Sequence, residues 1–205
     1  AALLGGSPRR CRSVRPVAER CKYFRQSMKS KTGFVDLITR YIIKQKGKKI
    51  RPLLVLLSAK ICGDINERTF RGAVLVELLH TATLVHDDVV DNANERRGLP
   101  SINAVWKNKI AVLMGDYLLS RGLMIAVDGN DFDFLKRITN TVKRMSEGEL
   151  LQIQKTRKLN IDEKTYFQII SDKTSSLIEA CCEIGAMSTS DDEEQILAMK
   201  EFGKY

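Results

Sequence analysis

The sequence predicts an all-α fold, and three observations lead to this prediction. Apolar residues recur at spacings of three and four along most of the chain from residue 22 onward. Neither a run of strand-type alternation nor an internal repeat interrupts this pattern. Residues 73–90 carry apolar side chains on more than one face, which is typical of a helix buried at the centre of a thick bundle. With 205 residues, 43% of them hydrophobic, the chain can build one sizeable core.

The first two helices are marked by periodicity and by proline and glycine. One face of the first helix consists of Phe34, Leu37, Ile38, Tyr41 and Ile42. A polar segment, residues 44–49, separates it from a second helix at 52–62. Pro52 suits the first turn of that helix, and Gly63 lies just beyond its end.

The later helices are bounded by capping and turn residues. Asp64 or Asn66 can cap a third helix at about 67–92. Residues 92–101 contain Gly98 and Pro100 and are expected to form a loop. Further helices are expected at about 102–128, 131–156, 162–187 and 191–203.

The N-terminal segment is more basic than the rest of the chain. Residues 1–20 hold five arginines and one glutamate, so they contribute +4 to the net charge of +9. We expect residues 1–21 to be a disordered or non-native head. A targeting segment is the alternative, since such segments are rich in arginine and poor in acids. Residues 22–205 then form a single helical domain.

The cysteines and the hydropathy pattern bear on the compartment. Five cysteines at scattered positions, none spaced as CxxC, argue against a disulfide framework. They favour a reducing compartment, and we expect a cytoplasmic location. None of the apolar runs approaches the roughly 18 consecutive residues that a membrane span needs.

The sharpest chemical signal is the acidic run HDDVVD, residues 86–91, which ends the long apolar segment. On a helix, Asp87 and Asp91 stand one turn apart and share a face. Together with Asp88 they would repel one another, and they favour a hard cation such as Mg²⁺. The alternative is a solvated acidic turn, although acids at a helix C-terminus oppose the macrodipole. His80 falls within about 20° of the face of Asp87, and it is either a core histidine or part of the same cavity.

Basic residues stand on both sides of this run in the sequence. Five cations lie within eight residues around Gly47, namely Lys44, Lys46, Lys48, Lys49 and Arg51. They form either a solvated face or, because Arg51 opens a helix, a phosphate site. Arg96 and Arg97 either balance the acidic run or clamp a diphosphate. The pair Lys173-Thr174 is by itself a weak signal.

Together these segments indicate a polyanionic substrate bound through Mg²⁺ and by direct cations. Nucleic acid is the rival polyanion. Against it, the acidic run would repel phosphates, aromatic residues make up only 6% of the chain, and the sequence contains no motif typical of nucleic-acid binding.

In these segments the sequence resembles the trans-isoprenyl diphosphate synthases, specifically long-chain polyprenyl (octaprenyl, heptaprenyl or solanesyl) diphosphate synthases of bacterial type. The matching segments are GKKIRP (47–52), ELLHTATLVHDDVVD (77–91), ERRG (95–98), GDYLLS (115–120), EGELLQI (147–153) and DKT (172–174). The resemblance covers about residues 22–205 and implies an isoprenoid synthase-type helical bundle around a central cavity. It also implies a Mg²⁺-dependent prenyltransferase that joins isopentenyl diphosphate head to tail with an allylic diphosphate such as farnesyl diphosphate. A long all-trans product for quinone side-chain biosynthesis is expected.

The resemblance assigns roles to individual residues. Asp87 and Asp91 would hold Mg²⁺ against the allylic diphosphate, with Asp88 in support. The same diphosphate would lie beside Arg96, Lys173 and Thr174. The diphosphate of isopentenyl diphosphate would be bound by Lys48, Arg51, His80 and Arg97. The cavity floor would include Leu79, Ala82 and Thr83, and small side chains without an aromatic there imply a long product.

The family also has a second aspartate-rich motif, which normally follows a segment like EFGKY (201–205), where this sequence ends. Residues 191–194 are interpreted instead as the favourably charged start of the last helix. The resemblance therefore implies the N-terminal part of a synthase, with exposed apolar surface. A non-catalytic or incomplete diphosphate-binding subunit is the alternative, and a terpene cyclase is a weaker one. Neither has an evident need for the full set of acidic and basic residues.

Two expectations concern partners. The family is mostly homodimeric, and the apolar face at 110–127 is a candidate interface. A strongly lipophilic product implies transient membrane contact without an anchor.

Overall fold

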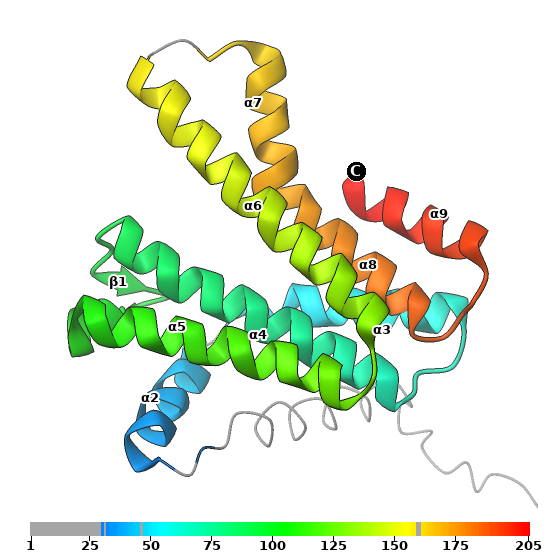
Figure 1. Cartoon of the computed structure of the whole chain (residues 1–205), viewed down its shortest axis with the longest axis horizontal. Helices are drawn as coiled ribbons and strands as arrows, with labels where there is room; N and C mark the ends of the chain where they lie inside the picture. The colour runs from blue at the N-terminus through cyan, green and yellow to red at the C-terminus, as the bar shows by residue number, and fades with distance from the viewer. Residues whose placement is uncertain (1–29, 31, 46, 159–160) are drawn as a thin grey trace, which may run out of the picture.

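The structure, a computed structural model, describes residues 30, 32–45, 47–158 and 161–205. Within these residues the chain forms a bundle of helices with a two-stranded hairpin at one end (Figure 1). The prediction of an all-α fold is confirmed. The predicted head, residues 1–21, lies outside the described residues.

The first two described helices follow the local signals in the sequence. Helix α2 (Gly33–Lys44) buries Ile38 and Ile42, whereas Phe34 and Leu37 on the predicted face are exposed. Helix α3 (Ile50–Cys62) begins two residues earlier than predicted, with Pro52 buried in its first turn. Its C-cap is Gly63, as expected.

Helix α4 (Glu67–Val90) is the central element of the bundle. Asn66 caps it by accepting a hydrogen bond from the backbone of Thr69, and the Thr69 hydroxyl accepts one from the backbone of Asn66. The helix packs against α3, against α5 (Ile102–Asp128) and against α8 (Ser176–Met187). The predicted buried central helix is therefore confirmed.

A short hairpin replaces the predicted loop between α4 and α5. Strand β1 (Glu95–Arg96) pairs antiparallel with β2 (Leu99–Pro100). The two residues between the strands, Arg97 and Gly98, both have positive φ angles, of 55° and 76°. This is the geometry of a two-residue turn that matches the twist of paired strands.

Helix α5 runs alongside α4, as Figure 1 shows. Its length and mean hydropathy would suffice to span a membrane. The sequence did not predict such a segment, because this helix lacks a run of about 18 consecutive apolar residues. Charged Asp116 and Arg121 interrupt it, and its buried residues, among them Met114 and Leu118, pack against α4 and α2. The packing is that of a bundle helix.

The predicted helix at 162–187 is divided into three parts. Helix α7 (Glu163–Ile170) passes into a single π-helical turn, η1 (Ser171–Ser175), which leads into α8. Helix α6 (Phe132–Lys158) contacts α7, η1 and α8. In Figure 1, α6 and α7 rise together from the bundle.

The last helix, α9 (Glu193–Lys204), packs against α8. Asp192 caps it by accepting hydrogen bonds from the backbone of Glu194 and Gln195, and acids occupy its first turn. The interpretation of residues 191–194 as a helix start is confirmed.

Two buried apolar clusters meet at α4. One joins α3, α4, α5, α6 and α8, and its largest members include Leu75, Phe134 and Ile184. The other joins α2, α4 and α5. Apolar side chains remain exposed outside these clusters, as expected, notably Leu150, Phe167, Leu197 and Phe202.

Candidate active site

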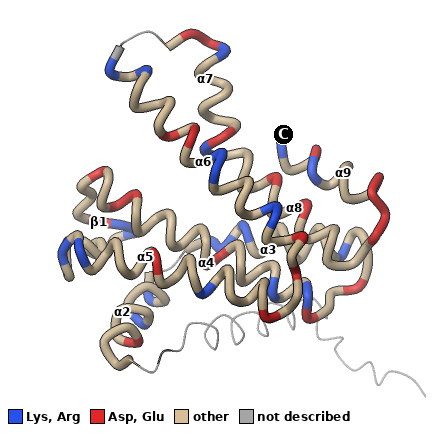
Figure 2. The backbone as a smooth tube through the Cα atoms, viewed as in Figure 1, with Lys and Arg blue, Asp and Glu red and all other residues tan. Residues whose placement is uncertain are grey.

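The acidic run lies at the C-terminal end of α4, where α4 passes into the hairpin. Asp87 is exposed, and Asp91 is the C-cap of the helix. Asp88 is only 2% exposed, because neighbouring residues on a helix point about 100° apart. Figure 2 shows acidic and basic residues close together at this end of α4. The three aspartates therefore do not act as one group.

Asp88 anchors the first arginine of the hairpin. Its Oδ1 accepts a hydrogen bond of 2.7 Å from Arg96 Nε and lies 2.6 Å from Arg96 Nη2. A buried carboxylate needs such a charged partner. This ion pair fixes the Arg96 guanidinium near the acidic run. The support that Asp88 was expected to give to a metal stays a prediction.

Asp87 lies in a field of other carboxylates. Its pKa is raised, first because the carboxylate is partly withdrawn from water, and then because Glu149 and Asp91 repel its negative charge. Lys173 and Arg96 oppose this effect. The residues predicted to hold the allylic diphosphate and its metal are thus brought together by three elements, α4, β1 and η1, and α6 adds Glu149 to them.

The residues of this cluster fit a hydrated magnesium ion. Within the described ranges, groups of three histidine, cysteine or acidic side chains with the geometry of a metal site do not occur. Magnesium usually keeps several waters and takes one or two protein carboxylates together with substrate phosphates. Asp87 and Asp91, one turn apart and mutually repelling, supply that number of ligands, and a cation would relieve the repulsion.

Lys173 reaches the cluster from the π-turn. Its Nζ lies 2.6 Å from Glu149 Oε2 and donates a hydrogen bond of 3.2 Å to Gln152 Oε1. Sequence reasoning did not assign roles to Glu149 and Gln152. The signal was available, because both lie in the segment EGELLQI. Thr174 is exposed in the same turn.

A basic cavity of about 390 Å³ includes Arg97, the residue next to Arg96, which is paired with Asp88 of the acidic run. The side chains predicted to bind the diphosphate of isopentenyl diphosphate all line it. Its lining consists of Gly47, Lys48, Lys49, Ile50, Arg51, Glu77, His80 and Arg97. Three segments spread over residues 47–97 therefore converge on one cavity. The buried Nε of Arg51 has no hydrogen-bond partner within the described part of the chain, and an anion in the cavity would suit it.

His80 is neutral in this cavity. Arg51 Nη1 donates a hydrogen bond of 2.9 Å to His80 Nε2, because a guanidinium can only donate. Burial first, and then the charges of Arg51, Arg97 and Arg96, lower the pKa of His80 from 6.5 to about 3. The Nδ1–H of the ring thus stays available as a neutral donor. His80 therefore belongs to the basic cavity.

Arg97 enters the basic cavity because of two backbone features. The hairpin turn holds Arg97 in the left-handed region, which is sparsely populated for residues other than glycine. Gly47 faces its guanidinium, and a Cβ at position 47 would overlap it. The turn and the missing side chain together place the positive charge beside Arg51 and His80.

The three predicted floor residues lie on α4 before the acidic run. Leu79 is buried in the cluster with α3, α6 and α8, whereas Ala82 is buried in the cluster with α2 and α5. Thr83 is half-buried, and its hydroxyl donates a hydrogen bond of 2.9 Å to the carbonyl of His80. They therefore point to different sides of the central helix.

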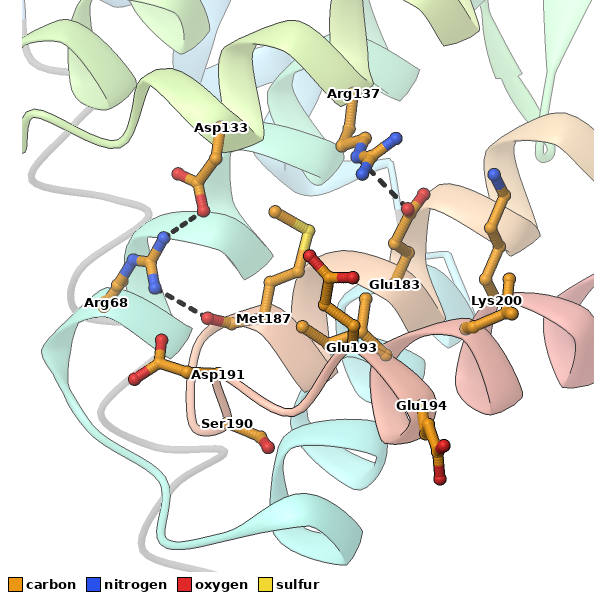
Figure 3. Close-up of a pocket in the computed structure, with 12 residues that line it drawn as sticks. Arg68, Asp133, Arg137, Glu183, Met187, Ser190, Asp191, Glu193, Glu194 and Lys200 are labelled. Carbon is orange, nitrogen blue, oxygen red and sulfur yellow. Dashed lines mark hydrogen bonds and ion pairs between the residues drawn. The ribbon is translucent and has the colours of Figure 1, made fainter.

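A larger cavity, of about 620 Å³, lies near the start of α4, away from these residues (Figure 3). Its basic side chains are already paired with acids. Arg68 binds Asp133 and the carbonyl of Met187, and Arg137 lies 3.1 Å from Glu183. A diphosphate would have to displace these pairs, so the cavity is a poor candidate for substrate.

The sequence of this chain is similar to those of known proteins. Residues 33–205 match the family model of polyprenyl synthetases. The chain is 39% identical over 167 residues to the all-trans-nonaprenyl-diphosphate synthase (geranyl-diphosphate specific) of Rhodobacter capsulatus, covering 81% of this chain and 51% of that protein. It is 31% identical over 180 residues to the octaprenyl diphosphate synthase of Escherichia coli K12, covering 88% and 56%.

Solved structures share the fold. A polyprenyl synthase from Caulobacter crescentus, complexed with calcium and isoprenyl diphosphate, has a TM-score of 0.89 at 31% identity. The match covers 94% of this chain and 58% of that chain. A decaprenyl diphosphate synthase from Rhodobacter capsulatus also has a TM-score of 0.89, at 33% identity, covering 93% of this chain and 59% of that one. The chain spans about half the length of the curated relatives that it matches.

Proposed function

This chain belongs to the polyprenyl synthetase family, and we propose on that basis that it performs the condensation of isopentenyl diphosphate with an allylic diphosphate. The proposed product is a long-chain all-trans polyprenyl diphosphate. The relatives compared above are named as synthases of such products.

One observation carries the proposal, namely that two charged sites with different chemistry adjoin at one end of α4. The basic cavity offers cations, while the cluster around Asp87 offers carboxylates that suit a metal. Adjacent residues of the hairpin serve both, since Arg96 binds Asp88 and Arg97 lines the basic cavity. A reaction between two diphosphates needs two such sites side by side.

The cluster around Asp87 would bind the allylic substrate. Bound there, Mg²⁺ would neutralise the diphosphate charge that grows as the carbon–oxygen bond breaks. Lys173 and Arg96 would hold the same diphosphate, and positive groups placed where charge develops stabilise the transition state. Thr174, in the same turn, would lie beside the site.

The basic cavity would bind isopentenyl diphosphate and orient it for attack. Lys48, Arg51 and Arg97 would supply positive charge. The neutral His80 would donate a hydrogen bond from Nδ1 without adding a further charge to the crowded cations. A terpene cyclase has no need of this second site, which favours condensation over cyclisation.

Product length, assembly and location complete the proposal. We infer a long product from the small side chains of Ala82 and Thr83. Because Ala82 is buried against α2 and α5, the half-buried Thr83 is the position to change, and Thr83→Phe is expected to shorten the products seen on chromatography. A homodimer would form through the α5 face that exposes Val112, Leu113 and Met124, and a single monomeric species in sedimentation would contradict this.

A cytoplasmic location with transient membrane contact through the product is proposed as well, and fractionation of cells would test it.

Incorporation of labelled isopentenyl diphosphate onto farnesyl diphosphate tests the proposed reaction. We expect Mg²⁺-dependent long products, and a loss of rate of about 10²-fold or more in Asp87→Asn/Asp91→Asn. Asp64→Asn, on the surface far from the site, is the control and should keep the activity. Equal rates in the double variant and the control would contradict the assignment. A chain that makes no product at all would favour the non-catalytic subunit.

A further inference from the structure

The π-turn η1 is the element that presents Lys173, and it is an unusual one. The backbone N–H of Ser176 donates to the carbonyl of Ser171, which is the i→i+5 pattern of a π-turn. Such turns are rare and are found mostly as single turns at functional sites. A π-turn is wider than an α-helical turn and so changes the direction of its side chains. The contacts that stabilise the turn therefore also set these directions.

Lys173 itself does not hold the turn. Its side chain is 43% exposed and carries the ammonium group at the end of a long, flexible stem. Its contacts with Glu149 and Gln152, both on α6, engage only the tip of that stem. The direction in which Lys173 leaves the backbone is therefore set beneath it.

The residue beneath it is the neighbouring Asp172, which is 9% exposed. Its Oδ1 accepts a hydrogen bond of 3.0 Å from Arg144 Nε, and its Oδ2 accepts one of 2.5 Å from Gln168 Nε2. Its carbonyl accepts one of 2.6 Å from the hydroxyl of Ser176. Asp172 is thus tied to α6, to α7 and to α8.

Arg144, on α6, joins the two sides of the turn. Besides Asp172, its guanidinium donates 2.9 Å to Glu179 Oε2 and 3.4 Å to the hydroxyl of Ser171. Burial alone would lower the pKa of Arg144, but the hydrogen bonds to Glu179 and Asp172 outweigh it and raise that pKa. One permanently charged planar group therefore spans from the start of the turn to the helix after it.

The same face of α6 approaches the turn closely. Gly148 is one helical turn beyond Arg144, and a Cβ there would come within 2.9 Å of Asp172 Cβ. Glu149 and Gln152, which follow on α6, contact Lys173. A single stretch of α6, residues 144–152, thus fixes both the backbone of the turn and the tip of its lysine.

We propose that Arg144 is a positioning residue, whose guanidinium, bound to Asp172 and Glu179, holds the π-turn so that Lys173 points toward Asp87 and Glu149. The role rests on the proposed function, because it takes Lys173 to bind the allylic diphosphate. Arg144 acts through Lys173 and does not itself contact the substrate.

A double-mutant cycle on the full chain tests this role. The affinity for inorganic pyrophosphate with Mg²⁺ is measured by calorimetry in Arg144→Gln, Lys173→Gln and the double variant. We expect each single change to weaken binding, Arg144→Gln by about three- to tenfold. The double variant should bind like Lys173→Gln alone, because a misdirected lysine and an absent one are equivalent.

Two further variants separate positioning from stability. Arg137→Gln removes another ion pair between α6 and α8, far from the turn, and should lower the unfolding temperature without changing the affinity. Arg144→Lys keeps the positive charge but loses the planar guanidinium that binds Asp172 and Glu179 together. It should restore part of the affinity. If Arg144→Gln does not fold, Asp172→Asn takes its place in the cycle.

The results of these measurements distinguish the positioning role of Arg144 from the proposed function. Losses that multiply in the double variant would overturn the positioning role while leaving the proposed function intact. An Arg144→Gln affinity equal to that of the unmodified chain would do the same. If Lys173→Gln has no effect, both the role of Lys173 and the positioning role fall, whereas a loss in Asp87→Asn/Asp91→Asn would still support the metal site.

Discussion

Several charged side chains of the site owe their direction or charge to a single partner. Asp88 is buried and fixes Arg96, while Gly47 leaves room for Arg97. His80 accepts a hydrogen bond from Arg51 and stays neutral. Neighbouring residues thus set the positions and charges of the side chains proposed to bind substrate. Changing one of them should therefore have a measurable effect on ligand binding or on the stability of the fold.

His80 should make the fold sensitive to acid. Its pKa is 6.5 in the unfolded chain and about 3 in the fold, so between these values the unfolded state binds more protons. Stability present above pH 6.5 is therefore lost as the pH falls, by up to about 1.4 kcal/mol per pH unit. His80→Gln cannot titrate, so its free energy of unfolding, measured in urea, should fall less steeply between pH 6.5 and pH 4. Parallel pH curves would contradict the assignment.

Gly47→Ala should weaken binding without weakening the fold. The added Cβ meets the end of a flexible side chain, so Arg97 moves while the backbone stays. We expect a change of less than about 0.5 kcal/mol in unfolding free energy, together with a lower affinity for isopentenyl diphosphate in calorimetry. Gly33→Ala, where a Cβ meets open space, is the matched control. The same affinity in both variants would show that Arg97 does not bind this substrate.

At the scale of elements, local sequence signals predicted the positions of the helices well, but they did not predict the π-turn or the hairpin. Proline, glycine and the Asn66 cap set the ends of α3 and α4 within a few residues of the predictions. The π-turn was missed because residues 171–175 contain no helix breaker, and an inserted residue barely disturbs apolar periodicity. The hairpin was missed because strands of two residues are too short to alternate.

The cap of α4 provides a test at this scale. Asn66 accepts from Thr69 and also donates a hydrogen bond of 2.8 Å to the carbonyl of Ser188 at the end of α8. Asn66→Ala should therefore lower the unfolding free energy by more than the roughly 1 kcal/mol typical of a cap. Asp162→Ala removes the exposed cap of α7 and should cost only the typical amount. Equal losses in chemical denaturation would mean that the tie to α8 adds nothing.

At the scale of the whole molecule, the residues proposed to bind the two substrates lie at one end of α4. The sequence predicted the acidic run and the basic residues, and the structure brings each set together. The segment EGELLQI contains Glu149 and Gln152 but does not show what they contact, and Arg144 lies outside every matching segment. All three lie on α6 and join the site only through packing. A one-dimensional pattern records which residues share a face of one helix, but not which faces meet.

The most direct test of the account is whether the two charged sites bind different diphosphates. Calorimetry would compare isopentenyl diphosphate with farnesyl thiolodiphosphate, an allylic analogue that resists ionisation. We expect isopentenyl diphosphate to bind without Mg²⁺ and to lose affinity in Arg97→Gln but not in Asp87→Asn/Asp91→Asn. The analogue should need Mg²⁺ and show the opposite pattern. If either variant weakened both ligands equally, or if the ligands competed, a single shared site would replace the two proposed here.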